Sequence, residues 1–218
     1  MGNRMNITNY IPLFLKGSYV TLAAWFCAGT GSLLIGTLLG ILSAESIGRK
    51  KTIVVIKLYT FISKGIPAYV QILIAYFIIP DLIGINVSGF LAGTCALALC
   101  SSGYVTEIVR TQINAISLGQ WDACFVLGYT RPQTLKRIIL PQVFKISLPT
   151  LIGELEQLLK SSSLLATIGV TELTRVGMNV ISRELNPMPI YLTIAALYLC
   201  FSALLYAATS VLKKRILS

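Results

Sequence analysis

The stretch Gly119–Gln142, GQWDACFVLGYTRPQTLKRIILPQ, is polar, basic and helix-prone, yet apolar runs long enough to cross a bilayer lie on both sides of it. Two S/T-x-x-Q patterns, Ser117–Gln120 and Thr130–Gln133, are typical of capping boxes, in which hydroxyl and amide side chains bond orphan backbone N–H groups. Each pattern marks the start of a helix. The stretch therefore predicts two short helices joined by a sharp bend at Gly128–Tyr129.

Glycine and proline fix the ends of these two helices. Gly128 favours the left-handed conformation that closes the first helix. Pro132 suits the first turn of the second helix, because its missing N–H has no helical partner there. We expect Pro141 to end the second helix.

The rest of the chain is too apolar for a soluble domain. Of the 218 residues, 55% are hydrophobic and only 12% are charged, and the mean hydropathy is +0.78. A soluble domain carries about 25% charged residues. A spanning helix needs about 20 mainly apolar residues. We predict an all-α polytopic membrane protein, a single domain over residues 1–218, with five transmembrane helices at Val20–Leu42, Leu58–Ile79, Val87–Val109, Ile146–Val170 and Ile190–Leu212.

The net charge of +10 is unevenly distributed among the loops. The second loop holds only Asp81 and the fourth balances its charges, whereas basic residues gather elsewhere. Positive loops face the cytoplasm, so we expect the first loop, the third loop and the C-terminus inside and the N-terminus outside. The excess of basic charge then suits anionic lipid better than nucleic acid. The basic residues of these segments are Arg49, Lys50, Lys51, Lys57, Arg110, Arg131, Lys136, Arg137, Lys145, Lys213, Lys214 and Arg215, while Arg4 and Lys16 argue weakly against this orientation.

Cysteine and histidine usage argues against several kinds of catalytic or metal site. The cysteines are odd in number, form no CxxC pair, and mostly lie in apolar runs, where Cys behaves as a small hydrophobe. A disulfide framework, a zinc site or a bound cofactor is therefore not expected. The absence of histidine removes Ser–His and Cys–His catalysis. The cysteines are Cys27, Cys95, Cys100, Cys124 and Cys200.

The bent helix pair has two interpretations. One is an amphipathic helix that lies on lipid headgroups. The other is a docking element, with an apolar knob and a basic rim, that fits a cleft of a cytoplasmic partner. Two capped helices with a fixed bend favour docking, because a surface anchor needs no defined corner. The apolar sides consist of Trp121, Phe125 and Leu127 in the first helix and Leu135, Ile138 and Ile139 in the second.

The same stretch resembles the cytoplasmic coupling loop of ABC importer permeases. That loop carries the pattern E-A-A-x3-G-x9-I-x-L-P, and the spacing is intact here. Asp122 stands for Glu, and Cys124 stands for the second Ala. Both changes keep the charge or the approximate size. The matching positions are Asp122, Ala123, Cys124, Gly128, Ile138, Leu140 and Pro141.

Further blocks are similar to the polar amino acid branch of these permeases, of the histidine, arginine or glutamine type. Phe61–Gln71 resembles F-x-R-G-T-P-x-x-V-Q with one extra residue, Lys64 in place of Arg and Ile66 in place of Thr. Glu107–Arg110 and Gly119–Trp121 match directly. Leu158–Leu173 resembles L-L-K-D-[ST]-S-L ending in I-G-V-x-E-L, with Ser161 in place of Asp. The blocks keep their order over about residues 17–212, with the coupling loop at 110–145.

The resemblance implies a type I importer and a set of partners. Two permease chains, alike or paralogous, would form the pore, a dimer of ATP-binding cassette subunits would grip the coupling helices, and an external solute-binding protein would deliver the ligand. The chain carries no P-loop of its own, so ATP would bind the partners and this chain would not be an enzyme. A bacterial inner membrane is the expected location. The residues expected to couple to the ATPase are Gln120, Trp121, Asp122, Ala123, Gly128, Tyr129 and Arg131.

Ionisable side chains inside the fourth span are the candidate substrate site. Each costs about 2.5–3.5 kcal/mol at a helix centre, so a pairing or a function is expected. Glu156 and Lys160, four residues apart, either neutralise each other or line a ligand path with carboxylates for ammonium groups and Lys160 for a carboxylate. Two acids favour a cationic amino acid of the arginine or lysine kind. The candidate set is Glu154, Glu156, Gln157, Lys160 and Ser161, and the arc expected to face lipid is Leu151, Ile152, Leu155, Leu158 and Leu159.

Residues near the ends of the second and third spans are candidates for gating or anchoring. Glu107 and Arg110 form either a local ion pair or an anchor for the coupling loop. Lys64 either snorkels to the membrane surface, or lies where Gly65 and Pro67 kink the second span. The sequence leaves both questions open.

Three other functions compete with a transport subunit. A self-contained secondary transporter or channel predicts internal repeats, and none is visible. An intramembrane enzyme needs a catalytic pair, and neither HExxH nor GxSxG occurs. The remaining alternative is a scaffold whose third loop only docks a partner.

Overall fold

The structure, a computed structural model, describes residues 7–217, and the side chains of residues 7–210. Within this range every regular element is helical, which confirms the all-α prediction. Arg4 and the side chains of Lys213, Lys214 and Arg215, which entered the charge argument, lie outside the described residues.

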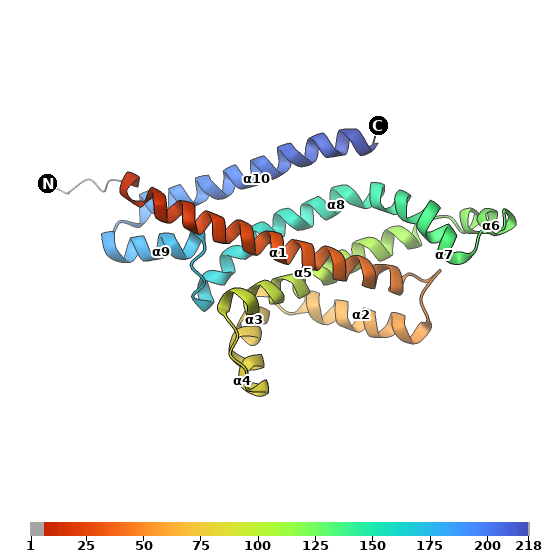
Figure 1. Cartoon of the computed structure of the whole chain (residues 1–218), viewed down its shortest axis with the longest axis horizontal. Helices are drawn as coiled ribbons and strands as arrows, with labels where there is room; N and C mark the ends of the chain where they lie inside the picture. The colour runs from red at the N-terminus through yellow and green to blue at the C-terminus, as the bar shows by residue number, and fades with distance from the viewer. Residues whose placement is uncertain (1–6, 218) are drawn as a thin grey trace. The chain divides into compact units, whose positions relative to one another are not determined.

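Four helices are long and apolar enough to cross a membrane (Figure 1). Helix α1 (Ile11–Ser43) follows a 3₁₀ turn, η1 (Ile7–Tyr10), and begins nine residues before the predicted first span. Helices α5 (Gly89–Asn114), α8 (Leu140–Ser161) and α10 (Pro187–Leu217) correspond to the predicted third, fourth and fifth spans. Hydropathy therefore located these four spans correctly.

The predicted second span, Leu58–Ile79, is broken. Helix α2 (Lys50–Gly65) ends before Ile66 and Pro67, which have extended ψ angles of 129° and 136°. The chain then forms α3 (Ala68–Leu73), a π-helical segment η2 (Ile74–Ile78) and α4 (Ile79–Ile83). A proline disfavours the helical conformation of the residue before it, so the break falls at Ile66–Pro67. Counted together, the two parts make a fifth candidate span.

The chain divides into two compact units, each built from separate stretches of sequence. Among the described residues, unit 1 contains residues 7–30, 67–98 and 156–208, and unit 2 contains residues 31–66, 99–155 and 209–217.

Unit 2 is held together by close packing of α1 on α5. A Cβ added to Gly36 would lie 2.5 Å from Val105 Cβ, and one added to Gly40 would lie 2.7 Å from Val109 Cβ. Such glycines let two membrane helices approach closely. The apolar core beside this contact consists of Ala44, Val105, Val109, Ile113, Trp121, Ile139, Val143 and Leu151.

Unit 1 contains an amphipathic helix, α9 (Leu173–Glu184), that the sequence analysis treated as loop. Its inward side chains follow helical spacing at Leu173, Val176 and Val180 and pack with Phe14, Ile190 and Ile194. The Leu173 N–H donates to Thr21 Oγ1 at 3.0 Å, which ties α9 to α1. The period of about 3.6 residues in LTRVGMNVISRE was the available signal.

The apolar arc of α8 was predicted to face lipid, and this prediction was wrong. Leu151, Ile152, Leu158 and Leu159 are between 1% and 7% exposed, so these four pack inside the chain, and the fifth member of the arc, Leu155, is partly buried. The helix also ends at Ser161, before the predicted Val170, and continues as a 3₁₀ helix, η4 (Ser162–Ile168). Side chains buried against other helices of one chain are as apolar as those facing lipid, so hydropathy does not separate the two.

Candidate functional site

The predicted bent pair of short helices exists at one end of unit 2 (Figure 1). Helix α6 (Leu118–Val126) leads through Gly128 to α7 (Arg131–Thr134). Gly128 has a φ of +80°, and the Tyr129 N–H donates to the Cys124 carbonyl at 3.0 Å. Both features are typical of a left-handed helix termination, so the bend at Gly128–Tyr129 is confirmed.

The two predicted capping boxes differ. At the second, the Thr130 N–H donates to Gln133 Oε1 at 2.8 Å and the box is formed. At the first, Ser117 Oγ accepts from the Gly119 N–H at 3.3 Å, but Gln120 bonds Gln142 at 3.2 Å instead of closing the box. The Gln120 side chain thus links α6 to the start of α8.

The expectation that Pro141 ends the second helix was wrong. Helix α7 continues through a π-helical turn, η3 (Leu135–Ile139), into α8, and Pro141 is the second residue of α8. Within η3 the Leu140 N–H bonds the Leu135 carbonyl, five residues back. The wider turn interrupts the α-helical ladder just before the proline, and Pro141 then lies in the first turn of α8, where a helix tolerates a residue without an N–H. Helix α7 is therefore continuous with the fourth span.

The inner side of the corner is firmly packed. Trp121 and Cys124 are each 5% exposed, and Trp121 belongs to the apolar core of unit 2. Arg131 Nη1 donates to the Ser46 carbonyl at 3.3 Å, in the loop after α1. A small cavity of about 230 Å³ lies between Ile47, Trp121 and Pro132. Trp121 and Arg131 therefore attach the corner to the span ends.

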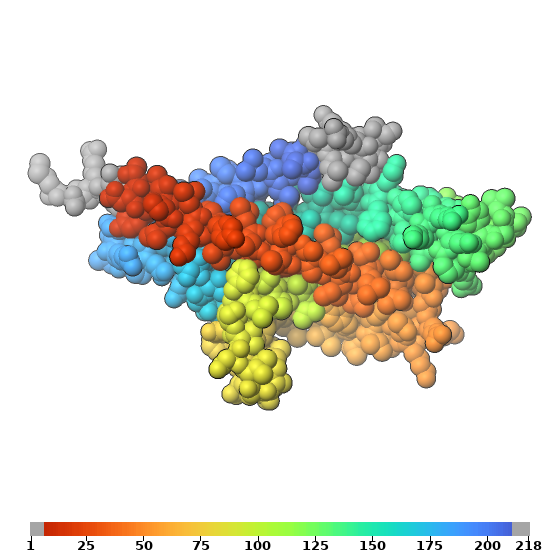
Figure 2. All heavy atoms as spheres, in the orientation of Figure 1, coloured from red at the N-terminus to blue at the C-terminus, as the bar shows by residue number. Residues whose placement is uncertain are grey.

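The outer side of the corner is apolar and uncovered within this chain. Leu118, Val126 and Leu127 are 73%, 87% and 74% exposed. Asp122 and Ala123 are exposed beside them. Figure 2 shows this end of unit 2 as a green protruding surface. Of the predicted apolar sides, Leu127 and the 41% exposed Phe125 remain on the outer side, whereas Trp121 and Ile139 are buried, so that part of the prediction was wrong. Leu118 and Val126, which were not predicted, complete the apolar knob.

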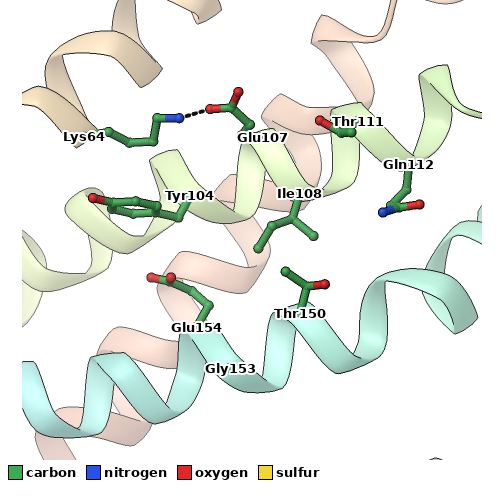
Figure 3. A pocket seen from close by; sticks show the side chains of 9 residues that line it. All are labelled: Lys64, Tyr104, Glu107, Ile108, Thr111, Gln112, Thr150, Gly153 and Glu154. Atoms are coloured by element: carbon green, nitrogen blue, oxygen red, sulfur yellow. Dashed lines mark hydrogen bonds and ion pairs between the residues drawn. The ribbon is translucent and has the colours of Figure 1, made fainter.

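A pocket of about 530 Å³ lies between α2, α5 and α8 of unit 2 (Figure 3). Its charged side chains are Lys64 at the end of α2, Glu107 on α5 and Glu154 on α8. Its other lining residues are Tyr104, Ile108, Thr111, Gln112, Thr150 and Gly153. The pocket brings together residues that the sequence analysis assigned separately to gating and to substrate binding.

Glu107 holds two cations at once. It pairs with Lys64 across 43 residues of sequence, and its Oε1 lies 3.1 Å from Arg110 Nη2 on the next helical turn. The Glu107–Arg110 pair was one of the predicted alternatives. The Lys64–Glu107 pair was not predicted, because no local pattern links α2 to α5. The second span breaks directly after Lys64 and Gly65, as the kink alternative predicted, and Lys64 is paired with Glu107 beside this break.

Glu154 is the only member of the predicted substrate set that lines this pocket. Its Oε1 accepts from Ser101 Oγ at 2.7 Å. Gln157 and Lys160 are exposed, and Glu156 and Ser161 are partly exposed. All four lie on the last two turns of α8. Within the part of the chain that the structure describes, no ion pair joins Glu156 to Lys160. The mutual neutralisation of these two residues is therefore absent.

Comparison with known proteins identifies the family. A family model described as "Binding-protein-dependent transport system inner membrane component" matches residues 36–218. The chain belongs to this family. The resemblance to ABC importer permeases, based on the coupling-loop pattern, is thereby confirmed.

The permease has relatives that cover most of its length. An arginine transport system permease protein, ArtQ, of Bacillus subtilis is 34% identical over 165 residues, 76% of this chain and 74% of that protein. A putative glutamine transport system permease protein, GlnP, of Rickettsia felis is 32% identical over 209 residues, 95% of both. A crystal structure of an amino acid ABC transporter with histidines superposes with a TM-score of 0.87 at 32% identity, covering 99% of both chains.

One buried acid of the permease was missed as a site residue. Glu172, in unit 1, is fully buried at the start of α9, where its carboxylate accepts from the Thr174 and Arg175 N–H groups at 2.8 and 2.7 Å. Tyr198 Oη also donates to it at 3.1 Å. Burial raises the pKa of the Glu172 carboxyl above its ordinary value, and these hydrogen bonds oppose that rise. An acid immediately before an apolar period of 3.6 was the available sequence signal.

Proposed function

We propose that the permease is the membrane-spanning subunit of an ATP-driven importer of a polar amino acid. The observation that carries the proposal is the uncovered apolar corner at Val126 and Leu127, on a bend held by Gly128. An exposed apolar patch rimmed by polar residues marks a protein interaction site. The partner that we propose for the corner is a dimer of ATP-binding cassette subunits, and membership of an importer permease family supports this proposal.

The corner is suited to transmit force from that partner. Its buried Trp121 and its Arg131–Ser46 hydrogen bond attach it to the span ends, and η3 makes α7 continuous with α8. A pull on α6 and α7 would therefore reach the fourth span directly. Gln120, Asp122, Ala123 and Tyr129 complete the proposed coupling surface.

The proposed substrate is a cationic amino acid, of the arginine or lysine kind. Support comes from the relative named as an arginine permease and from the carboxylates of Glu154 and Glu156 on the fourth span, whereas the relative named for glutamine supports only a polar amino acid. Gln157, Lys160 and Ser161 extend this polar side of α8. If the acids set the preference for positive charge, Glu154→Gln and Glu156→Gln should shift transport from cationic towards neutral amino acids. Unchanged selectivity in both variants would contradict the proposed cationic substrate.

Two further partners and an orientation belong to the proposal. A second permease chain, a copy or a paralogue, completes the pore, and an external binding protein delivers the ligand. The chain resides in a bacterial inner membrane with the N-terminus outside and the corner in the cytoplasm. The charge distribution of the loops supports this orientation.

The docking claim is tested by coexpressing the permease with an ATP-binding cassette subunit from the same cell and measuring whether the two copurify. Val126→Asp and Leu127→Asp place a charge in the apolar patch without touching the core, so ATPase recovery should fall while the permease stays folded. Leu185→Asp is the matched control, because Leu185 is 83% exposed and lies in unit 1. Equal ATPase recovery with all three variants would refute the docking claim.

A further inference from the structure

The start of α2 carries charges of the unfavourable sign. Arg49 is its N-cap, Lys50 and Lys51 are its first two residues, and its first turn holds no acid. A helix N-terminus is the positive end of the helix dipole, so cations there destabilise the helix. All three side chains are exposed, and within the described residues no ion pair joins them to Glu45 or to another acid. An anion from outside the chain would relieve this repulsion.

Arg131 of the corner adds a fourth cation beside the same loop. Its Nη1 donates to the carbonyl of Ser46, three residues before Arg49. Both residues line the 230 Å³ cavity, where the buried Ser46 Oγ has no hydrogen-bond partner among the described residues. The start of α2 and the corner lie at the same end of unit 2 (Figure 1). This end therefore offers guanidinium, ammonium and hydroxyl donors, which are the groups that bind a phosphate.

An apolar face of α2 leads away from these charges. Val55, Leu58 and Ile62 follow Lys51 at helical spacing on one face, and they are 66%, 57% and 49% exposed. The buried residues of the helix lie on the opposite face and are Ile56, Thr60 and Ser63. From Lys51 to Ile62 the helix rises about 16 Å, which is about half of the roughly 30 Å hydrocarbon core of a bilayer. A cationic end above an apolar face of this length matches the headgroup and acyl chains of one phospholipid.

We propose that this end of unit 2 binds an anionic glycerophospholipid. Arg49, Lys50 and Lys51 hold its phosphate, Arg131 contacts the same headgroup from the corner, and the acyl chains lie along the exposed face of α2. An acidic protein partner would match the cations but would leave the apolar face unexplained, because that face belongs to a candidate membrane span. The inference rests on the membrane location of the chain and does not need the proposed substrate or the proposed ATPase.

The test uses the purified full-length permease in detergent. Binding is measured as thermal stabilisation, since a ligand that binds only the folded state raises the unfolding temperature. Dioleoylphosphatidylglycerol supplies the anionic headgroup and the chains, dioleoylphosphatidylcholine supplies the same chains without net charge, and glycerol 3-phosphate supplies the anion without chains. Only the first should stabilise the wild type at low concentration.

The other outcomes with these probes overturn the proposal. Equal stabilisation by the two lipids would mean that charge is not recognised. Equal stabilisation by glycerol 3-phosphate would mean that the ligand is a soluble phosphate and not a lipid. No stabilisation by dioleoylphosphatidylglycerol would mean that the site does not exist.

Removing the three cations should weaken binding of the anionic lipid strongly. Each basic residue near an anionic lipid contributes about fivefold, so the combined Arg49→Gln, Lys50→Gln and Lys51→Gln variant should bind dioleoylphosphatidylglycerol about a hundredfold more weakly. The fold is retained, because these side chains are exposed and their loss removes repulsion at the helix start.

A control variant loses the same three charges elsewhere in unit 2. Its exposed cations lie on η3 and α8 and do not line the cavity. It should bind the lipid almost as well as the wild type does. Equal losses in the two variants would mean a diffuse attraction to surface charge, and the assigned site would be wrong. The control substitutions are Lys136→Gln, Arg137→Gln and Lys145→Gln.

Copurification separates this inference from the proposed docking of the ATPase. In detergent without added lipid, the variant of the three α2 cations should retain a coexpressed ATP-binding cassette subunit, whereas Val126→Asp should lose that subunit and still bind the lipid. If the cation variant loses the ATPase subunit but binds the lipid as the wild type does, the cations serve the ATPase and the lipid site is refuted. If Val126→Asp retains the ATPase subunit while the lipid pattern holds, the docking claim alone fails.

Discussion

Glu172 anchors the start of α9 through three hydrogen bonds to one buried carboxylate. Glu172→Ala leaves the Thr174 and Arg175 N–H groups, which are partly buried, without this acceptor. A fully buried donor without a partner costs about 1–3 kcal/mol, so the free energy of unfolding in detergent should fall by about 1–3 kcal/mol. Chemical denaturation of the purified complex measures it.

Glu45→Ala is the control for this substitution. Glu45 is exposed, and surface substitutions of this kind change the free energy of unfolding by less than about 0.5 kcal/mol. Glu172→Gln, which keeps one acceptor oxygen, should lie between the two. A loss for Glu172→Ala no larger than that for Glu45→Ala would show that the carboxylate does not anchor α9.

The raised pKa of Glu172 also predicts a dependence of stability on pH. Because burial raises this pKa in the folded protein, the folded state binds more protons than the unfolded state just above the ordinary carboxyl pKa. Stability from this group is complete below the unfolded pKa and is lost as the pH rises through the folded one. The wild type should therefore gain more stability than Glu172→Gln between about pH 7.5 and about pH 5.

Unfolding temperatures of the two proteins at both pH values measure this difference. Other titrating groups are common to the two proteins and cancel in the comparison. Identical pH profiles for wild type and Glu172→Gln would mean that the carboxyl titrates alike in the folded and unfolded states.

At the scale of elements, α6 and α9 each end in a left-handed residue, with opposite consequences for stability. Gly128 after α6 has a φ of +80°, and Leu185 after α9 has a φ of +53°. A side chain in this conformation costs about 1–2 kcal/mol, which only Leu185 incurs. Leu185 is 83% exposed, and a Cβ on Gly128 would meet no neighbour. Backbone strain therefore dominates both sites.

Substitutions at these two ends should act in opposite directions. Leu185→Asn should raise the free energy of unfolding, because Asn tolerates this conformation, whereas Gly128→Ala should lower it by about 1–2 kcal/mol. Urea unfolding of the two variants and the wild type tests both. A loss of stability for Leu185→Asn would show that the exposed leucine makes contacts in the complex that outweigh its strain.

Sequence patterns predicted the elements whose causes are local. Gly128 and the Thr130–Gln133 box placed the bend correctly, since each acts within one turn of the chain. Pro141 misled, because the π-turn that tolerates it depends on how α7 and α8 run together. The break at Ile66–Pro67 was open to prediction as a kink but not as a complete end of the helix.

At the scale of the whole molecule, contacts between distant segments could not be predicted. The pairing of Lys64 with Glu107 joins helices 43 residues apart, and nothing in either segment specifies the other. The burial of the α8 leucines could not be predicted for a similar reason. Hydropathy reports how apolar a helix face is, but not whether lipid or another helix covers that face. Of the residues predicted to bind substrate, Glu154 alone lines the pocket.

The orientation in the membrane is the prediction that belongs to the whole chain. The corner at Asp122 and the exposed face of α9 at Asn179 are separated in sequence by one candidate span, Arg131–Ile168. One crossing puts them on opposite sides of the bilayer, and the basic third loop puts Asp122 in the cytoplasm. Asp122→Cys and Asn179→Cys, each in a background without the five native cysteines, report this directly. An impermeant thiol reagent applied to whole spheroplasts should label only Asn179→Cys, and applied to inside-out vesicles only Asp122→Cys. The opposite labelling would invert the orientation, and labelling of both from one side would mean that α8 does not cross, which would remove the route from the corner to the pocket.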